Sequence, residues 1–169
     1  MNYKSFKKIN IKMGMTKEQI RALLNQLQND TSCRYDLDYF SEKNPNPYEW
    51  KAILEGTQGS IYEDGFYMIK IVFDSNYPES RPAIYFLNKI FHPHVHSSGS
   101  ACIVPSKNDI ISVLETVESM FLDYDADIDH AYGEEPRKLF ESDPDKFIEK
   151  AKEWVNAYAK LEDLDKFYD

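Results

Sequence analysis

The stretch of this chain with the clearest capacity for chemistry is HPHVHSSGSAC, residues 92–102. It places His92, His94 and His96 on alternate positions and ends on Cys102. Imidazole and thiolate groups bind zinc, an imidazole beside a thiol can activate it, and a thiolate alone can carry an acyl group. The stretch therefore admits three kinds of site: a zinc site, a cysteine–histidine hydrolase site, and a site built on the cysteine alone.

The sequence argues against zinc. Pro93 disrupts the regular strand that would put the three imidazoles on one face, and Ser97-Ser98-Gly99 is typical of a turn. Dedicated zinc sites usually combine paired Cys or His motifs from two segments, and the sequence holds no second pair. We therefore expect no metal. A hydrolase stays open, because any of the four histidines could fold close to Cys102, although no protease signature surrounds it.

The elements that must position this stretch are indicated by the spacing of apolar residues. Residues 16–29 begin with Thr16 and Gln19 at the spacing of a capping box and continue with apolar residues at helical spacing. Between residues 34 and 87, short runs rich in β-branched and aromatic residues are separated by Gly, Pro, Asn and Asp. These runs predict four strands, one of which alternates apolar side chains as a strand with one buried face does.

After Cys102 the apolar residues return to helical spacing, first along residues 108–122 and then beyond Asp143, an expected N-cap before Pro144. The whole order predicts an α+β domain. It begins with an N-terminal helix, continues with a four-stranded antiparallel meander and the loop holding Cys102, and ends with C-terminal helices. We expect the helices to pack on one side of the sheet.

Composition restricts the partners and the compartment. The chain has 169 residues and a formal net charge of −9, and residues 121–169 carry 15 acidic against 7 basic side chains. Such an acidic body lacks the basic footprint that phosphate binding requires, so nucleic acid is not an expected partner. No apolar run approaches the roughly 18 residues of a membrane span, so we expect no membrane association. Two cysteines do not suggest a disulfide framework, and we expect a chain of the reducing cytoplasm, the nucleus or both.

The order of residues from Trp50 onward resembles that of a known family. The shared positions are Trp50, Gly56, Tyr62-Glu63-Asp64-Gly65, Phe73, Tyr77-Pro78, Pro82, His92-Pro93, Gly99 and Cys102. Their order and spacing closely resemble the ubiquitin-conjugating enzymes, whose core runs YP, P, HPN, G and C. The resemblance covers about residues 15–160, which we take as the core domain. Residues 1–14 are then a basic N-terminal extension, and residues 161–169 an acidic C-terminal tail.

The resemblance implies a specific role for Cys102. It would receive ubiquitin, or a ubiquitin-like protein, as a thioester from an activating enzyme, and the acyl group would pass to an amine of a protein substrate or to a ligase. No cofactor is implied, because a thiolate is both a good nucleophile and a good leaving group. His92-Pro93 would fix the loop before the cysteine, and Gly99 would let the backbone turn beside it.

Two departures from the family lie next to the predicted site. The Asn of HPN, which in the family orders the loop and stabilises the oxyanion, is His94 here, and an HPH variant occurs in a branch that modifies α-amino termini. The family's acidic gate residue aligns with His130, with Asp127 and Asp129 as close alternatives. A lysine amine with a pKa of about 10.4 must lose a proton before attack, whereas an α-amine, at about 7.7 to 8.0, is already partly neutral. A site with less deprotonating machinery should therefore favour α-amines.

Other departures concern the partners. The segment after Cys102 is shorter than in the family and lacks the Trp-Ser-Pro loop that helps contact ligases. The Phe that often follows Tyr-Pro is Glu79, beside Pro78, so we expect an unusual ligase contact. Lys17 and Arg21 lie where the family's first helix meets the activating enzyme, and the lysines of the N-terminal extension could add to them.

Two alternatives stay open from the sequence. Ubiquitin-conjugating folds without the cysteine act as adaptors, and RWD domains share the pattern from Tyr77 to Pro82. The chain could thus be a catalytically degenerate adaptor that binds ubiquitin-pathway proteins, although Cys102 after Gly99 counts against this. The cargo could also be a ubiquitin-like modifier, and nothing in the sequence separates it from ubiquitin.

Overall fold

The structure is a computed structural model that describes residues 14–124 and 133–167. Its elements are α1 (Lys17–Asn29), β1 (Leu37–Tyr39), β2 (Glu49–Glu55), β3 (Phe66–Val72), β4 (Ala83–Phe86), α2 (Ile110–Leu122), α3 (Glu134–Ser142), α4 (Pro144–Tyr158) and the 3₁₀ helix η2 (Leu161–Phe167). The strands form one antiparallel sheet in the order β1-β2-β3-β4. The predicted α+β architecture is confirmed: an N-terminal helix, a four-stranded meander and C-terminal helices.

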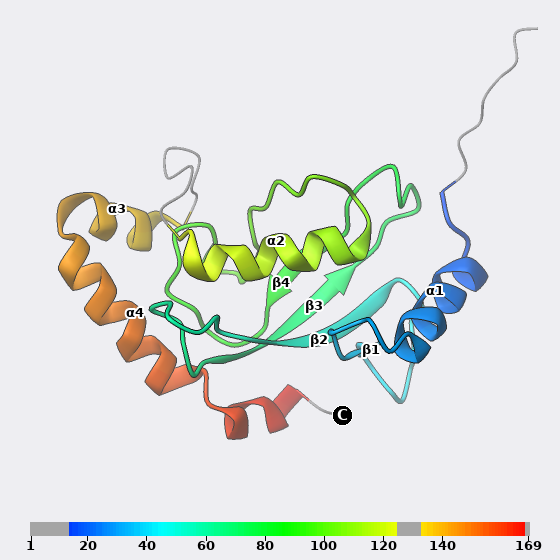
Figure 1. Cartoon of the computed structure of the whole chain (residues 1–169), viewed down its shortest axis with the longest axis horizontal. Coiled ribbons are helices and arrows are strands. Elements are labelled where there is room, and N and C mark those ends of the chain that lie inside the picture. The colour runs from blue at the N-terminus through cyan, green and yellow to red at the C-terminus, as the bar shows by residue number, and fades with distance from the viewer. Residues whose placement is uncertain (1–13, 125–132, 168–169) are drawn as a thin grey trace, which may run out of the picture.

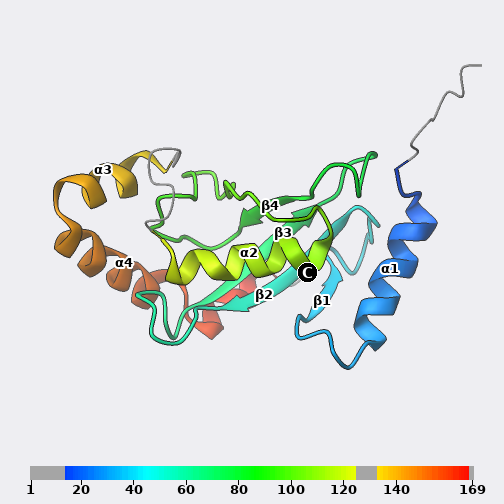
Figure 2. The ribbon, with the colours of Figure 1, turned by 45° about the horizontal axis from the view of Figure 1, so that its top comes forward.

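The helices occupy three different places around the sheet. Helix α2 crosses one face, α1 lies at one end of the molecule, and α3 and α4 lie at the other end (Figures 1 and 2). The segment from Phe86 to Cys102 leaves β4 and returns along its edge before α2 begins. Within residues 14–124 and 133–167, no helix is long and apolar enough to cross a membrane.

Local sequence signals explain where the helices begin. The expected capping box of α1 is present, since Gln19 N donates to Thr16 Oγ1 at 3.3 Å and Thr16 N donates to Gln19 Oε1 at 2.8 Å. Asp109 caps α2 by accepting from Ser112 N at 3.0 Å. The side chains that α2 buries against the sheet are Ile110, Val113, Leu114, Val117, Met120 and Phe121.

The C-terminal part of the fold contains features that the sequence did not predict. Helix α3 has no fully buried side chain, and its first turn is acidic, with Glu134 and Glu135. It therefore lacks the repeated apolar positions by which a helix is predicted from sequence. Residues Leu161–Phe167, within the expected C-terminal tail, form η2, which packs on β3 on the face opposite α2 (Figures 1 and 2). Leu164 and Met68 are each only 1% exposed, so this part of β3 is buried on both faces. The expectation that the helices pack on one side of the sheet is therefore wrong, because η2 covers the other face (Figures 1 and 2).

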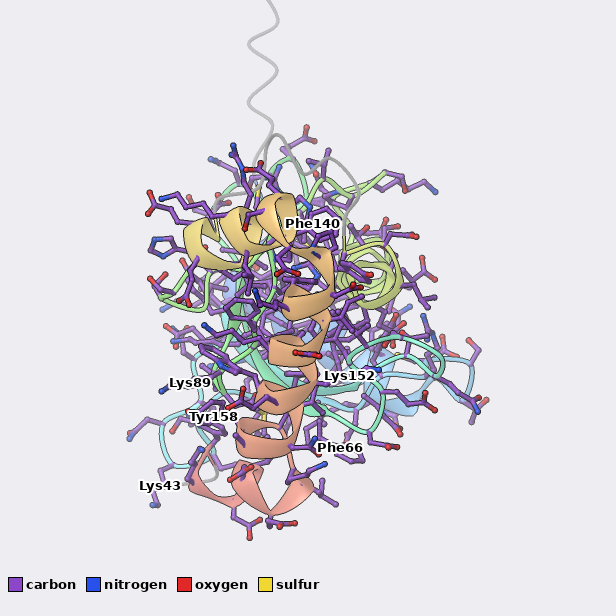
Figure 3. The ribbon with its side chains drawn as sticks, turned by 90° about the vertical axis from the view of Figure 1, so that its left-hand side faces the viewer. Lys43, Phe66, Lys89, Phe140, Lys152 and Tyr158 are labelled. Atoms are coloured by element: carbon purple, nitrogen blue, oxygen red, sulfur yellow. The ribbon has the colours of Figure 1, made fainter. Side chains whose placement is uncertain are left out.

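Asn88 joins the end of α4 to the sheet. Its amide donates to the carbonyls of Phe66 and Tyr158 at 2.9 and 3.1 Å, and its Oδ1 accepts from Met68 N at 3.0 Å. Figure 3 looks onto this end of the molecule and shows Phe66 and Tyr158 beside the last turns of α4. Because Asn88 is buried and bonds through both ends of its amide, α4 has a fixed position relative to the sheet.

Candidate active site

The residues between His92 and Cys102 form a short hairpin, not a loose loop. Cys102 N donates to the His94 carbonyl at 2.8 Å, His96 N donates to the Ser100 carbonyl at 2.9 Å, and Val95 pairs with Ala101 between them. In such antiparallel pairing His94 lies directly opposite Cys102, on the same face as His96 and Ser100. Val95, on the other face, is 4% exposed. We call this segment, residues 92–102, the catalytic hairpin, and its face with Cys102 the thiol face.

The second arm of the hairpin is attached to the edge of β4. Phe86 N donates to the Gly99 carbonyl at 2.8 Å, Ala101 N donates to the Ile84 carbonyl at 2.9 Å, and Ser100 pairs with Tyr85. Gly99 has a φ of 87°, and a Cβ there would lie 2.2 Å from the Phe86 carbonyl oxygen. Only glycine fits this position, which explains its place three residues before Cys102.

The first arm is anchored by the buried imidazole of His92. Its Nε2 lies 2.9 Å from the Met120 carbonyl oxygen of α2, and its Nδ1 accepts from His94 N at 2.9 Å. Because an amide N–H can only donate, the ring proton must be on Nε2, which donates to Met120. Burial lowers the pKa of His92 to about 3, so the ring is neutral. Both ring nitrogens are engaged within the protein, and His92 therefore has no lone pair left for a metal.

A second buried group supports the same arm. The Tyr62 hydroxyl donates to the Phe91 carbonyl at 2.8 Å, and its ring centroid lies 5.3 Å from that of His92. Tyr62 is fully buried, and burial raises the pKa of its hydroxyl well above the ordinary value, so it remains a donor. The Tyr62-Glu63-Asp64-Gly65 pattern thus has a structural reason: Tyr62 holds the start of the hairpin.

Gly133 is a residue of the site that sequence reasoning missed. Its N–H donates to the Pro93 carbonyl at 2.8 Å, and a Cβ there would lie 2.6 to 2.7 Å from the carbonyl oxygens of His92, Pro93 and Val95. A signal was available, because Gly133 is followed by two acids and Pro136, a pattern of helix starts. The predicted gate residues Asp127, Asp129 and His130 lie outside the described residues.

The segment after Cys102 connects the site to the expected partner-binding residues. Ile103 is buried, but Val104 is 81% exposed. Asn108 Nδ2 donates to the Glu79 carbonyl at 2.6 Å, and Ile110 N donates to the Tyr77 hydroxyl at 3.2 Å. The structure thus places the Pro78-Glu79 turn, whose residues are both exposed, beside the start of α2.

The same turn also meets the start of α1. Met15 N donates to the Tyr77 carbonyl at 2.7 Å, directly before the helix that carries Lys17 and Arg21. Both of these basic residues are exposed and lie one helical turn apart. Among residues 14–124 and 133–167, no three His, Cys, Asp or Glu side chains gather in a way that could hold a metal ion.

Comparison with known proteins identifies the family. The family described as ubiquitin-conjugating enzyme matches residues 17–155 of this chain. Ubiquitin-conjugating enzyme E2 7 of Arabidopsis thaliana is 30% identical over 148 residues, which cover 79% of this chain and 84% of that protein. Ubiquitin conjugating enzyme E2 B of Dictyostelium discoideum is 32% identical over 121 residues, 68% of this chain and 80% of that protein.

The chain belongs to the ubiquitin-conjugating enzyme family. A crystal structure from Plasmodium yoelii, described as that of a candidate ubiquitin conjugating enzyme, matches with a TM-score of 0.72 over 87% of this chain and 97% of that one. At 24% identity this match shows the shared fold alone. Membership in the ubiquitin-conjugating enzyme family favours a site built on the cysteine over a zinc site or a hydrolase. Cys102, opposite His94 on the catalytic hairpin, is the candidate centre of that site.

Proposed function

We propose that Cys102 accepts ubiquitin, or a ubiquitin-like modifier, as a thioester and transfers it to an amine of a protein substrate or to the cysteine of a ligase. In the first step the Cys102 thiolate attacks the thioester by which an activating enzyme holds the modifier, and that enzyme's thiol leaves. In the second step an amine attacks the new thioester, the Cys102 thiolate leaves, and the proton of the amine passes to solvent. Neither step needs a cofactor.

The observation that carries this proposal is the pairing of Cys102 with His94 in a chain of this family. The tetrahedral intermediate of acyl transfer carries negative charge on oxygen, and a preorganised donor stabilises it. An imidazole N–H can supply that hydrogen bond. The main chain of His94 is fixed on both sides, by the bond from its N–H to His92 and by the bond from Cys102 N to its carbonyl. We therefore assign His94 the part of oxyanion donor.

The acceptor amine follows from the groups on the thiol face. The described hairpin, residues 92–102, places His94, His96, Ser100 and Cys102 on that face and contributes no carboxylate of its own. An α-amine needs less help to lose its proton than a lysine amine. We propose that the enzyme favours α-amino groups. Discharge of the thioester onto free lysine and onto a short peptide without lysine tests this, and faster discharge onto lysine would contradict it.

A charging assay tests the central step. The chain is mixed with an activating enzyme, ubiquitin, ATP and Mg²⁺ and run on a non-reducing gel. We expect an adduct that thiols remove, that Cys102→Ala abolishes, and that Cys33→Ala, the matched change at the second cysteine, preserves. With no ubiquitin adduct, the assay is repeated with ubiquitin-like modifiers. Failure with all of them would leave the adaptor, which binds pathway proteins without carrying a modifier.

The proposed partner surface consists of four exposed residues at the end of the molecule that carries α1: Lys17, Arg21, Pro78 and Glu79. We place the activating enzyme on α1 at Lys17 and Arg21, and a ligase at the Pro78-Glu79 turn beside it. A charge reversal of Lys17 and Arg21 should slow loading of Cys102 more at low salt than at high salt, because exposed charges are screened by salt. We expect these encounters in the cytoplasm or the nucleus.

A further inference from the structure

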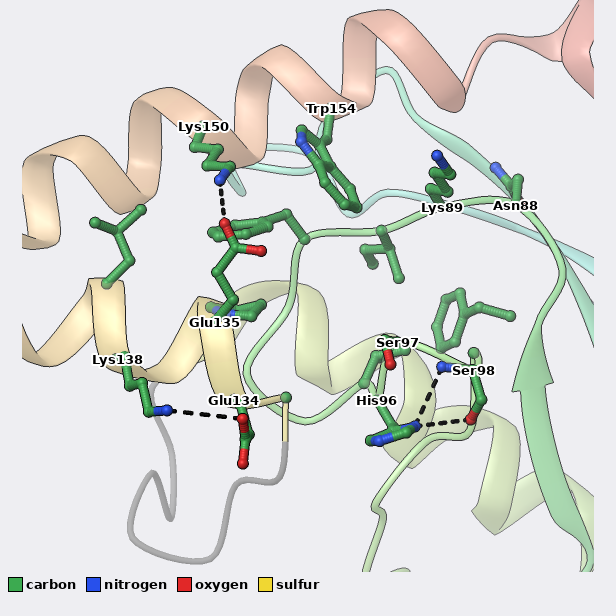
Figure 4. Close-up of a pocket in the computed structure, with 18 of the residues that line it drawn as sticks. Asn88, Lys89, His96, Ser97, Ser98, Glu134, Glu135, Lys138, Lys150 and Trp154 are labelled. Carbon is green, nitrogen blue, oxygen red and sulfur yellow. Dashed lines mark hydrogen bonds and ion pairs between the residues drawn. The ribbon is translucent and has the colours of Figure 1, made fainter.

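A cavity lies between the catalytic hairpin and the two C-terminal helices. It has a volume of about 960 Å³ and is bounded by the hairpin tip, the segment that follows β4, α3 and α4 (Figure 4). We call it the α3–α4 cavity. Its size is that of sites that take a drug-sized molecule or a few residues of a chain.

The inner surface of the cavity is apolar and its edge is polar. Phe91, Leu139 and Trp154 line it, and Trp154 reaches into it from α4 (Figure 4). At the edge, Lys150 pairs with Glu135, and Lys138 Nζ lies 3.6 Å from Glu134 Oε2. A third lysine, Lys89, has its Nζ 4.8 Å from the centroid of the Tyr158 ring. Three lysines and two glutamates line the cavity, a formal net charge of +1, and two of the three lysines are paired with acids, so the edge is a weak site for a phosphate group. Apolar side chains on an uncharged backbone suit it better.

The cavity and the thiol face share the hairpin tip. His96, Ser97, Ser98 and Gly99 line the cavity, and His96 also belongs to the thiol face with Cys102. Along a strand, two residues advance about 6.6 Å, which separates the His96–Ser100 pair from the His94–Cys102 pair. An extended chain advances about 3.3 Å per residue, so a polypeptide whose amine lies at Cys102 passes His96 at about its second residue. Its following residues then reach the cavity.

The ring of His96 is held at this crossing point. Ser98 N donates to His96 Nδ1 at 3.2 Å, and the Ser98 hydroxyl lies 2.9 Å from the same nitrogen (Figure 4). The hairpin tip therefore has a defined shape where the thiol face meets the cavity.

We propose that the α3–α4 cavity binds the acceptor polypeptide, taking apolar side chains at about the third and fourth residues after the attacking α-amine. The proposal rests on the proposed transfer function and adds a substrate class to it: extended N-terminal segments with apolar residues close behind the first residue. It predicts that the enzyme selects acceptors by their sequence, not by the amine alone.

Binding can be measured without any transfer. The chain has two tryptophans, of which Trp50 is fully buried in the core and Trp154 lines the cavity, so a change of tryptophan fluorescence reports on the cavity. The probe is a peptide of about ten residues with a free α-amine, leucine at the third and fourth positions, and glycine and serine elsewhere. We expect a saturable signal that Trp154→Phe removes and that the same peptide with serine for leucine does not give. Equal signals from the two peptides, or none from either, would overturn the proposal.

Transfer kinetics give the second test. Thioester-loaded enzyme is mixed with the leucine peptide or with glycinamide, an α-amine without following residues. Leu139→Ala removes apolar wall, and Ser142→Phe fills the space from an exposed position, so each should raise the KM for the peptide by about fivefold or more. The rate with glycinamide should stay within about twofold. Lys152→Phe, on the exposed side of α4 and outside the cavity, is the matched control (Figure 3).

The two proposals fail in different ways. If no modifier forms a thioester on Cys102, the transfer function falls, and the fluorescence titration still decides whether the cavity binds the peptide. If the thioester forms but the cavity variants leave the peptide KM unchanged, or slow peptide and glycinamide equally, the cavity proposal falls alone. Full activity of Ser142→Phe with the peptide would count equally against it, because that change narrows the cavity on the α3 side.

Discussion

The chain before Cys102 and the chain after it are built differently. The segment from His92 to Ala101 is held by a buried imidazole, a buried tyrosine, the edge of β4 and the cradle around Gly133. The segment from Ile103 to Asp109 is held at its far end by Asn108 and Ile110, and it exposes Val104. The segment before Cys102 has the rigidity that orientation of the proposed thioester requires, whereas the segment after it presents side chains that a partner can reach.

The largest effect is expected at Gly99, where the segment before Cys102 leaves no room for a side chain. Gly99→Ala forces a Cβ to 2.2 Å from the Phe86 carbonyl at a φ of 87°. We expect the free energy of unfolding to fall by about 3 kcal/mol or more, measured by urea denaturation. The control is Gly59→Ala, which has a similar φ of 81° and no neighbour within 4 Å of the added Cβ. Equal losses in the two variants would show that the close approach to β4 does not matter.

The next effect is a pH dependence that belongs to His92. Its folded-state pKa of about 3 lies below the ordinary value of 6.5, so the unfolded chain binds a proton first as the pH falls. The stability that His92 contributes is complete above about pH 6.5 and is lost progressively between that pH and 3. From pH 7 to pH 5 the free energy of unfolding should fall by about 2 kcal/mol through this group.

The comparison that isolates this effect is with His92→Gln, whose amide does not titrate. Urea denaturation of both proteins at pH 7, 6 and 5 should show the wild-type chain losing stability faster. The carboxylates whose pKa values are lowered by hydrogen bonds, Glu18, Asp30, Asp74, Asp109 and Asp143, have ordinary values below about 5, so their stabilisation is lost mainly below this range. Parallel losses in the two proteins would mean that His92 is not the group responsible.

A smaller effect separates two tyrosines with the same chemistry. Tyr62→Phe leaves the buried Phe91 carbonyl without its donor and should cost about 2 kcal/mol of unfolding free energy. Tyr77→Phe removes the acceptor of Ile110 N at the start of α2 and should cost about 1 kcal/mol. Thermal unfolding of the two variants measures the difference. A larger loss for Tyr77→Phe would mean that the segment after Cys102 is held more firmly than the segment before it.

The smallest effect on stability is expected at Val104. Because its side chain is 81% exposed, Val104→Ser should change the free energy of unfolding by no more than about 0.5 kcal/mol. Any slower loading or discharge of Cys102 in this variant would then come from a lost partner contact and not from a weakened fold. Calorimetry and the charging assay on the same preparation separate the two.

The sequence predicted the parts of the fold that depend on local signals. The capping box at Thr16, the cap at Asp143 before Pro144 and the apolar stripe of α2 are all present because each is a short-range interaction. Helix α3 was not predicted because its only large apolar side chains, Leu139 and Phe140, are adjacent in the sequence and give no helical repeat, although both pack against the core. The burial of Met68 was missed because η2, almost 100 residues later, covers a face that alternation alone assigns to solvent.

The candidate site was predictable in identity but not in arrangement. Motif order indicated Cys102, His92, His94 and Gly99, because each is a fixed residue type at a fixed spacing. The tautomer of His92 depends on an amide two residues away and a carbonyl on α2, which only the folded chain brings together. The cradle around Gly133 likewise depends on the carbonyls of His92, Pro93 and Val95, which precede α2 in the sequence whereas Gly133 follows it. No spacing rule predicts such a contact.

Tyr77 forms hydrogen bonds with both ends of the proposed partner surface. Its carbonyl accepts from Met15 at the start of α1, and its hydroxyl accepts from Ile110 at the start of α2. A protein seated on α1 that shifts the helix by even a small amount must move Tyr77 with it or break the first bond. That movement would pass to the first turn of α2 and so to the segment that follows Cys102. The speed of the proposed loading of Cys102 can therefore depend on the two hydrogen bonds by which Tyr77 links α1 to α2.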